Sequence, residues 1–185
     1  IAIVGPSVSG KDTLIDWLKL RLVDRDDVHF VRRAVTRKEV SASEDHMLLD
    51  TAEFDAMGHN GAFCVEWEAH DLKYGIPQSA LENTLRGNVV LANGSRKAMD
   101  KIAAVSENLI TANLIVDQQI LAARLAARGR ESAAEIARRI SRSDIALSER
   151  FNTIDVRNTG PIEEAGNQVL GLIESLLATD TRNIA

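Results

Sequence analysis

The strongest constraint on the fold is the order of residue types in the first eighteen positions. Four apolar residues at 1–4 precede a turn that contains Gly5, Gly10 and Lys11, and an amphipathic segment at 14–18 follows. A short apolar strand that leads through a glycine-bearing turn into a helix is typical of a parallel α/β unit. We therefore expect an α/β fold in which residues 1–4 form a buried strand of a mostly parallel sheet.

The turn matches the phosphate-loop pattern G-x-x-x-x-G-K-[ST] except at its last position, where Asp12 replaces the hydroxyl residue. Backbone N–H groups of such a loop surround phosphate oxygens, and the helix N-terminus adds positive potential. Lys11 would bring a full charge to the β- and γ-phosphates. The predicted ATP-binding residues are Gly5, Pro6, Ser7, Val8, Ser9, Gly10, Lys11, Asp12 and Thr13. The alternative is a glycine-rich turn that binds no ligand.

Asp12 allows two hypotheses, because the residue it replaces normally faces Mg²⁺. Magnesium prefers oxygen ligands and often binds through one or two carboxylates plus substrate phosphates. Asp12 is therefore a predicted metal ligand, with Thr13 as a hydroxyl partner. The alternative is that Asp12 only complements the positive end of the helix.

Composition limits the class of protein. The chain has 185 residues and a net charge of −5, which fits one globular domain and excludes a global basic surface for nucleic acid. A single cysteine, Cys64, excludes an internal disulfide framework and favours a reducing compartment. No apolar stretch reaches membrane-spanning length and no signal peptide is visible. We expect a cytoplasmic domain without a membrane partner, preceded by a few native residues before Ile1. The oligomeric state stays open, a homodimer included.

Strand-like and helix-like segments alternate along the chain. This order predicts a P-loop NTPase fold with helices on both faces of the sheet. We expect one domain over 1–185, with a core at 1–31 and 79–185, a small acceptor-binding insert at about 32–78, and a helical lid at about 124–142. Strands are predicted at 28–31, 62–67, 88–93, 109–116 and 151–156, a turn at 74–77, and helices from residue 50, at 78–86 and 96–106, from 117, at 132–149 and at 161–177.

An arginine-rich segment is the second chemical signal. Six arginines fall within nineteen residues: Arg124, Arg128, Arg130, Arg138, Arg139 and Arg142. Arginines on a mobile lid suit phosphoryl transfer, because guanidinium groups stabilise the charge that spreads over the transferring oxygens. The predicted catalytic residues are Lys11, Arg128, Arg130 and Arg139. For the outer arginines the alternative is a solvated helix face paired with Glu131 and Glu135.

Two further polar groups follow strands. Arg32, Arg33, Thr36 and Arg37 could hold a second phosphate or form an exposed basic turn. The stretch 93–96, Asn-Gly-Ser-Arg, comes where many P-loop enzymes place a metal-binding aspartate. Its alternative is a strand-to-helix turn capped by Ser95. The sequence shows no zinc-ligand spacing and no Ser-His-Asp arrangement.

These motifs together resemble the guanylate kinase superfamily over nearly the whole chain. The resemblance rests on the loop at 5–11, on Thr-Arg at 36–37, Glu-Trp at 66–67, Tyr-Gly at 74–75, and on 128–132. It implies that residues 36–37 hold the acceptor phosphate and that 128–132 belong to the lid. Three departures stand against guanylate kinase itself: Val40 replaces an arginine, His46 replaces a tyrosine, and residues 93–96 replace an Asp-x-Asp motif that helps to read guanine.

The departures are similar to a family within that superfamily, the ribose 1,5-bisphosphate phosphokinases of phosphonate degradation. Members carry Gly-Lys-Asp-[Ser/Thr] as at 10–13, a stretch like 69–77, and Asn-Gly-Ser-Arg as at 93–96. The resemblance implies ATP- and Mg²⁺-dependent conversion of a sugar bisphosphate to 5-phosphoribosyl 1-diphosphate. The implied acceptor-binding residues are Arg33, Arg37, His46, Tyr74, Asn93, Ser95 and Arg96. Two alternatives stay open: a guanylate or other nucleoside monophosphate kinase, kept by Glu66, and a non-catalytic guanylate-kinase-like module that binds proteins.

Overall fold

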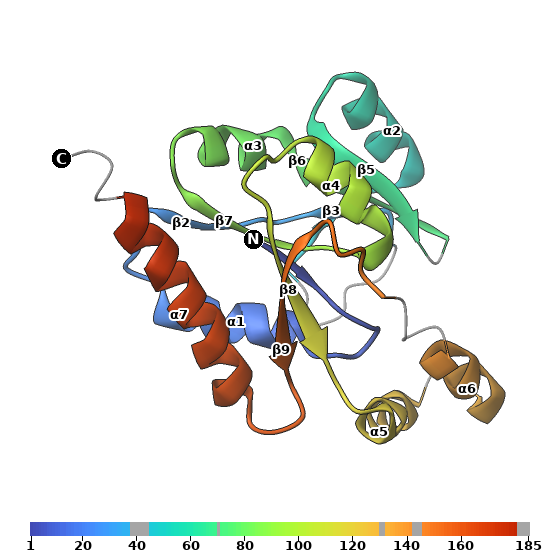
Figure 1. Cartoon of the computed structure of the whole chain (residues 1–185). Helices are drawn as coiled ribbons and strands as arrows, with labels where there is room; N and C mark the ends of the chain where they lie inside the picture. Colours follow the sequence, from blue (N-terminus) through green and yellow to red (C-terminus); the bar gives the residue numbers. More distant parts are fainter. Residues whose placement is uncertain (38–44, 70, 130–131, 142–145, 181–185) are drawn as a thin grey trace.

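A five-stranded parallel sheet forms the centre of the protein (Figure 1). The computed structural model describes residues 1–37, 45–69, 71–129, 132–141 and 146–180. In spatial order the strands are β2 (Val28–Phe30), β7 (Val89–Asn93), β1 (Ala2–Val4), β8 (Ile110–Ile115) and β9 (Asn152–Arg157), all paired in parallel. The predicted α/β class and the buried first strand are confirmed.

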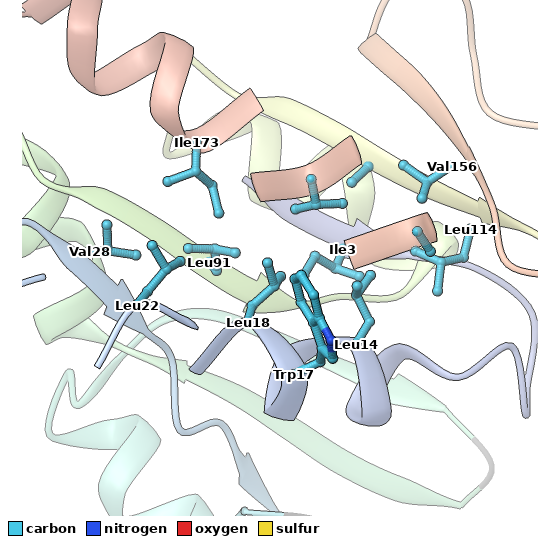
Figure 2. Close-up of a cluster of buried hydrophobic side chains, with 13 residues drawn as sticks. Ile3, Leu14, Trp17, Leu18, Leu22, Val28, Leu91, Leu114, Val156 and Ile173 are labelled. Atoms are coloured by element: carbon cyan, nitrogen blue, oxygen red, sulfur yellow. The ribbon is translucent and has the colours of Figure 1, made fainter. Parts of the chain in front are cut away.

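Side chains of β1 alternate between two separate cores. Ile3 points into a cluster closed by α1 (Lys11–Arg21) and α7 (Ile162–Asp180), where Trp17 and Ile173 also lie (Figure 2). Ala2 and Val4 point to the opposite face, which is covered by α3 (Gln78–Leu85), the 3₁₀ helix η1 (Arg96–Ala98) and α4 (Met99–Ala104). The sheet is thus covered by helices on both faces, as the alternation of elements predicts.

A smaller four-stranded sheet packs against the second core. Its strands, in the order β4-β3-β6-β5, are β4 (Met47–Leu48), β3 (Ala34–Val35), β6 (Leu72–Pro77) and β5 (Phe63–Ala69), and α2 (Thr51–His59) lies beside β5. The turn predicted at 74–77 is wrong, because these are the last four residues of β6. Gly75 suggested a turn, but a Cβ there would lie 2.7 Å from the Phe63 ring, so the strand needs glycine for close packing.

The remaining helices follow β8. These are α5 (Gln118–Arg128) and α6 (Ala133–Ser141). The Ser132–Glu135 capping box is present, as is the one between Asp50 and Glu53 at the start of α2. The predicted extension of α6 to 149 is wrong, since α6 ends at Ser141 and the described residues 146–150 are not helical. Within the described ranges, no helix is both long and apolar enough to cross a membrane.

Contact between α1 and α7 depends on glycine at position 166. A Cβ at Gly166 would lie 2.5 Å from the Trp17 ring, whereas one at Gly171 in the same helix would meet nothing within 4 Å. We expect Gly166→Ala to lower the free energy of unfolding by about 1–3 kcal/mol through overpacking. Gly171→Ala, the matched control, should raise it by about 0.5–1 kcal/mol through helix propensity. Urea unfolding measures both, and equal stabilities would contradict the packing argument.

Candidate active site

The phosphate loop connects β1 to α1 and curls around the Lys11 ammonium. Lys11 Nζ donates to the carbonyl oxygens of Pro6 at 2.8 Å and Gly5 at 3.2 Å. Gly10 adopts a left-handed φ of 87°, and a Cβ there would lie 2.6 Å from Asn158 Nδ2. Only glycine fits this position without strain. Before a nucleotide binds, the Lys11 ammonium is thus held at the loop by the Gly5 and Pro6 carbonyl oxygens.

Two residues from the second half of the chain hold the loop from outside. Asn158 is only 3% exposed, and its Nδ2 donates to the Ser9 carbonyl oxygen at 2.7 Å. Arg124 of α5 donates to the carbonyl oxygens of Val8 and Asn158, each at 3.4 Å. Sequence reasoning placed Arg124 among the lid arginines and missed Asn158. The available signal was the position of Asn158 directly after β9, at the carboxyl edge of a parallel sheet.

Asn93 connects the phosphate loop to the predicted acceptor side. Its Nδ2 donates to Asp12 Oδ1 at 2.6 Å, and its backbone oxygen accepts from Arg33 at 3.1 Å. Asn93 is 5% exposed and ends β7, so a buried amide stands between a carboxylate and a guanidinium. The structure thus joins three sequence-predicted residues in one network, although Asp12 and Asn93 are separated by 81 positions in the sequence.

Arg33 is held in place by two more predicted residues. Its guanidinium lies 5.1 Å from the Tyr74 ring centroid, and Tyr74 stacks on Trp67 with centroids 5.2 Å apart. Arg33 also contacts His46 Nε2 at 3.2 Å. A guanidinium can only donate, so Nε2 accepts and the His46 ring carries its proton on Nδ1 in this arrangement. Tyr74 is buried, and its ring face contacts the Arg33 guanidinium and so helps to orient it.

A small pocket that opens to solvent lies beside this network, and its empty space of about 310 Å³ includes part of that solvent. One wall is the face of α1 that carries Asp12, Asp16 and Lys19, and the other includes Arg33 and His46. The three residues of α1 are four and three positions apart, so their side chains share one face of the helix. The α1 wall next to the phosphate loop therefore carries two carboxylates and one ammonium, and the wall on the side of the smaller sheet carries Arg33, His46 and the Asp45 carboxylate.

Two ion pairs that share Asp45 form beside the pocket, and one of them connects its two walls. Lys19 Nζ lies 3.0 Å from Asp45 Oδ2, and Arg32 Nε lies 2.8 Å from Asp45 Oδ1. The hydrogen bond from Lys19 lowers the pKa of the Asp45 carboxyl, with a smaller contribution from Arg32. All three side chains are at least a third exposed, so the pairs set position more than stability.

Other sequence-predicted residues lie away from the pocket. Ser95 caps η1 by accepting from the Lys97 backbone N–H at 3.3 Å, and Arg96 donates to Asn113 Oδ1 at 3.0 Å. Thr13 is exposed, and neither it nor Arg37 lines the pocket. Arg128 and Arg139 are described only as backbone positions of α5 and α6, and Arg130, Arg142 and Val40 lie outside the described residues.

Comparison with known proteins gives a consistent result. A ribose 1,5-bisphosphate phosphokinase PhnN of Agrobacterium fabrum is 41% identical over 174 residues, which cover 94% of this chain and 95% of that protein. The chain belongs to the ribose 1,5-bisphosphate phosphokinase family. The protein of the same name from Rhizobium etli is 39% identical over 178 residues, covering 96% and 90% of the two chains. No family model matches the chain.

A solved guanylate kinase from Anaplasma phagocytophilum has the same fold as this phosphokinase-family chain, with a TM-score of 0.70 at 18% identity. The match covers 95% of this chain and 84% of the other. The expected P-loop kinase fold is thereby confirmed. Glu66, which kept guanylate kinase open as an alternative, lies against Gly58 of α2 and does not line the pocket.

Proposed function

We propose that this kinase transfers the γ-phosphoryl group of ATP to the 1-phosphate of ribose 1,5-bisphosphate, giving 5-phosphoribosyl 1-diphosphate and ADP. Membership of the family supports the substrate, and the pocket supports the chemistry. The observation that carries the proposal is the double contact of Asn93, 2.6 Å to Asp12 and 3.1 Å to Arg33. One buried residue thereby sets the distance between a phosphate-binding loop and a cation suited to a second phosphate.

The reaction needs alignment more than proton transfer. An oxygen of the acceptor 1-phosphate, already ionised near neutral pH, attacks the γ-phosphorus while the bond from that phosphorus to the β,γ-bridging oxygen breaks. No general base is required, so catalysis consists of holding the phosphates in line and neutralising their charge. We assign Lys11 and the loop amides to ATP, Arg33 and His46 to the acceptor, and Arg128, Arg130 and Arg139 to the lid.

Asp12 fits a role as the protein's Mg²⁺ ligand. Asn93 occupies one carboxylate oxygen, Oδ1, which leaves the other oxygen for a hard cation beside the phosphate loop. When bound, Mg²⁺ supplies charge neutralisation between the β- and γ-phosphates. Thr13 is a weaker partner, because its exposed side chain lies off the pocket-lining face of α1.

A substitution at Asp12 tests this assignment. We expect Asp12→Ser to raise the Mg²⁺ concentration that gives half-maximal turnover by about 10-fold, because the neutral hydroxyl is a weaker ligand. Turnover is titrated with Mg²⁺ at fixed ATP. Asp24→Ser, which removes the same charge from an exposed position outside the pocket, is the control. An Mg²⁺ titration that is identical in wild type and Asp12→Ser would sink the assignment.

Product identification tests the reaction itself. The chain is incubated with ATP, Mg²⁺ and ribose 1,5-bisphosphate, and phosphorus NMR follows the appearance of the sugar diphosphate together with ADP. GMP replaces the sugar in a parallel reaction. Turnover of GMP with none of the bisphosphate would overturn the proposal in favour of a nucleoside monophosphate kinase. Failure of the chain to bind ATP by calorimetry would instead favour a protein-binding module.

The single cysteine also supports a cytoplasmic location, which we propose for this kinase. Burial raises the pKa of the Cys64 thiol, so this residue has the character of a structural cysteine.

A further inference from the structure

Asp16 is an acidic residue of the pocket to which no role has yet been given. It lies one helical turn after Asp12 on α1, lines the pocket, and is exposed. Within the described part of the chain it makes no hydrogen bond or ion pair. Lys19, the nearest cation on the same face of α1, is instead paired with Asp45. An exposed carboxylate with acceptor capacity thus faces the space next to the phosphate loop.

Asn93 provides a second acceptor without a donor among the residues that line this pocket. The carboxylate of Asp12 can only accept, so the Asn93 amide must direct its nitrogen to Asp12. Its Oδ1 is therefore committed to the other side, is buried, and finds no donor among the described residues. Buried amide oxygens normally have a partner, and Asn93 lines the same pocket as Asp16.

The two acceptors restrict what can fill the α1 side of the pocket. A phosphate beside the Asp16 carboxylate would be repelled, and an acceptor phosphate is better placed at the Arg33 guanidinium on the opposite wall. The Mg²⁺ assigned to Asp12 belongs beside the phosphate loop, one helical turn before Asp16, so it leaves the Asp16 carboxylate for a different group. A neutral hydroxyl group satisfies both acceptors, because it donates without bringing charge.

We propose that Asp16 is a specificity-determining residue that accepts a hydrogen bond from a ring hydroxyl of the pentose, with Asn93 Oδ1 accepting from a neighbouring hydroxyl. This inference rests on the proposed function for the identity of the sugar. It adds that a residue of α1, the helix that follows the phosphate loop, selects the acceptor sugar. A carboxylate that reads hydroxyl groups rejects deoxy sugars, since its desolvation is then uncompensated.

Equilibrium binding tests the inference separately from turnover. Calorimetry measures ribose 5-phosphate, its 2-deoxy and 3-deoxy analogues, and inorganic phosphate with wild type and Asp16→Ala. We expect wild type to bind at least one deoxy analogue about 10-fold more weakly than ribose 5-phosphate. In Asp16→Ala, ribose 5-phosphate should bind about 10- to 100-fold more weakly and the preference over that analogue should fall to near one. Binding of inorganic phosphate should not weaken.

The sign of the effect separates hydrogen bonding from simple charge. If Asp16 acted only as a negative charge, its removal would tighten binding of every phosphorylated ligand. Asp24→Ala removes the same charge outside the pocket and should leave all affinities unchanged. Absence of ribose 5-phosphate binding in wild type, lack of discrimination in wild type, or unchanged discrimination in Asp16→Ala would each overturn the inference. Absence of ribose 1,5-bisphosphate turnover alone would overturn only the proposed function.

Discussion

We expect replacement of Lys11 by methionine to lower kcat by about 10²- to 10³-fold, because it removes a preorganised cation from a developing negative charge. Methionine keeps the length of the side chain but not its charge. The loop that folds around Lys11 Nζ through the Pro6 and Gly5 carbonyls places that charge before a nucleotide arrives. The binding of ATP should weaken less than kcat falls, because the loop amides remain.

Steady-state ADP release at saturating ATP and acceptor measures the effect. Lys101→Met is the matched control: Lys101 is exposed on α4, lies outside the pocket, and donates to the Glu66 backbone oxygen. It should retain wild-type kcat. A Lys11→Met variant that keeps kcat within about 10-fold of wild type would mean that transfer does not depend on the loop.

The second large effect concerns the acceptor side. We expect Arg33→Met to lower kcat/KM for ribose 1,5-bisphosphate by about 10- to 100-fold, which corresponds to losing a charge-assisted hydrogen bond. The KM for ATP should change little, since the contact of Arg33 toward the phosphate loop runs through Asn93, whereas Lys11 is held by carbonyl oxygens of the loop itself. Arg33→Lys should not restore activity, because an ammonium cannot lie flat on Tyr74 and also contact His46 and Asn93.

Arg25→Met provides the control for Arg33→Met. Arg25 is exposed and paired with Asp27 at 2.7 Å, outside the pocket, so its loss removes the same charge without touching the proposed acceptor site. The decisive comparison is the KM for acceptor against the KM for ATP in the two variants. Equal increases in both KM values for Arg33→Met would indicate a general loss of structure and contradict an acceptor role.

The parts of the fold with strong local signals could be predicted from sequence. The loop between β1 and α1 follows from glycine spacing, and the capping boxes at 50–53 and 132–135 follow from residue pairs three apart. Where one residue type serves two purposes, prediction was wrong: Gly75 suggested a turn, yet it is a strand residue that leaves room for Phe63. Local chemistry does not distinguish these two uses.

The sequence named several residues that the structure brings together, but it did not predict how they contact one another. Asn93 and Asp12 could be associated because each departs from the kinase pattern, and the structure joins them by a hydrogen bond. Tyr74 stays a predicted acceptor-binding residue, and the structure adds that its ring lies beside the Arg33 guanidinium. Asn158 and Asp16 belong to no sequence motif. Asn158 contacts the phosphate loop and Asp16 lines the pocket only in the folded chain, so neither position could be recognised from the sequence.

The supports of the phosphate loop have a consequence for the order in which the protein is made. Ser9 and Asn158 are separated by 149 positions, and Val8 and Arg124 by 116. During synthesis the loop leaves the ribosome well before the residues that support it from outside, which follow 116 to 149 positions later. Contacts of such long range form slowly. The phosphate loop therefore cannot reach its final supported shape in a nascent chain until β9 and Asn158, the residue after it, have been added.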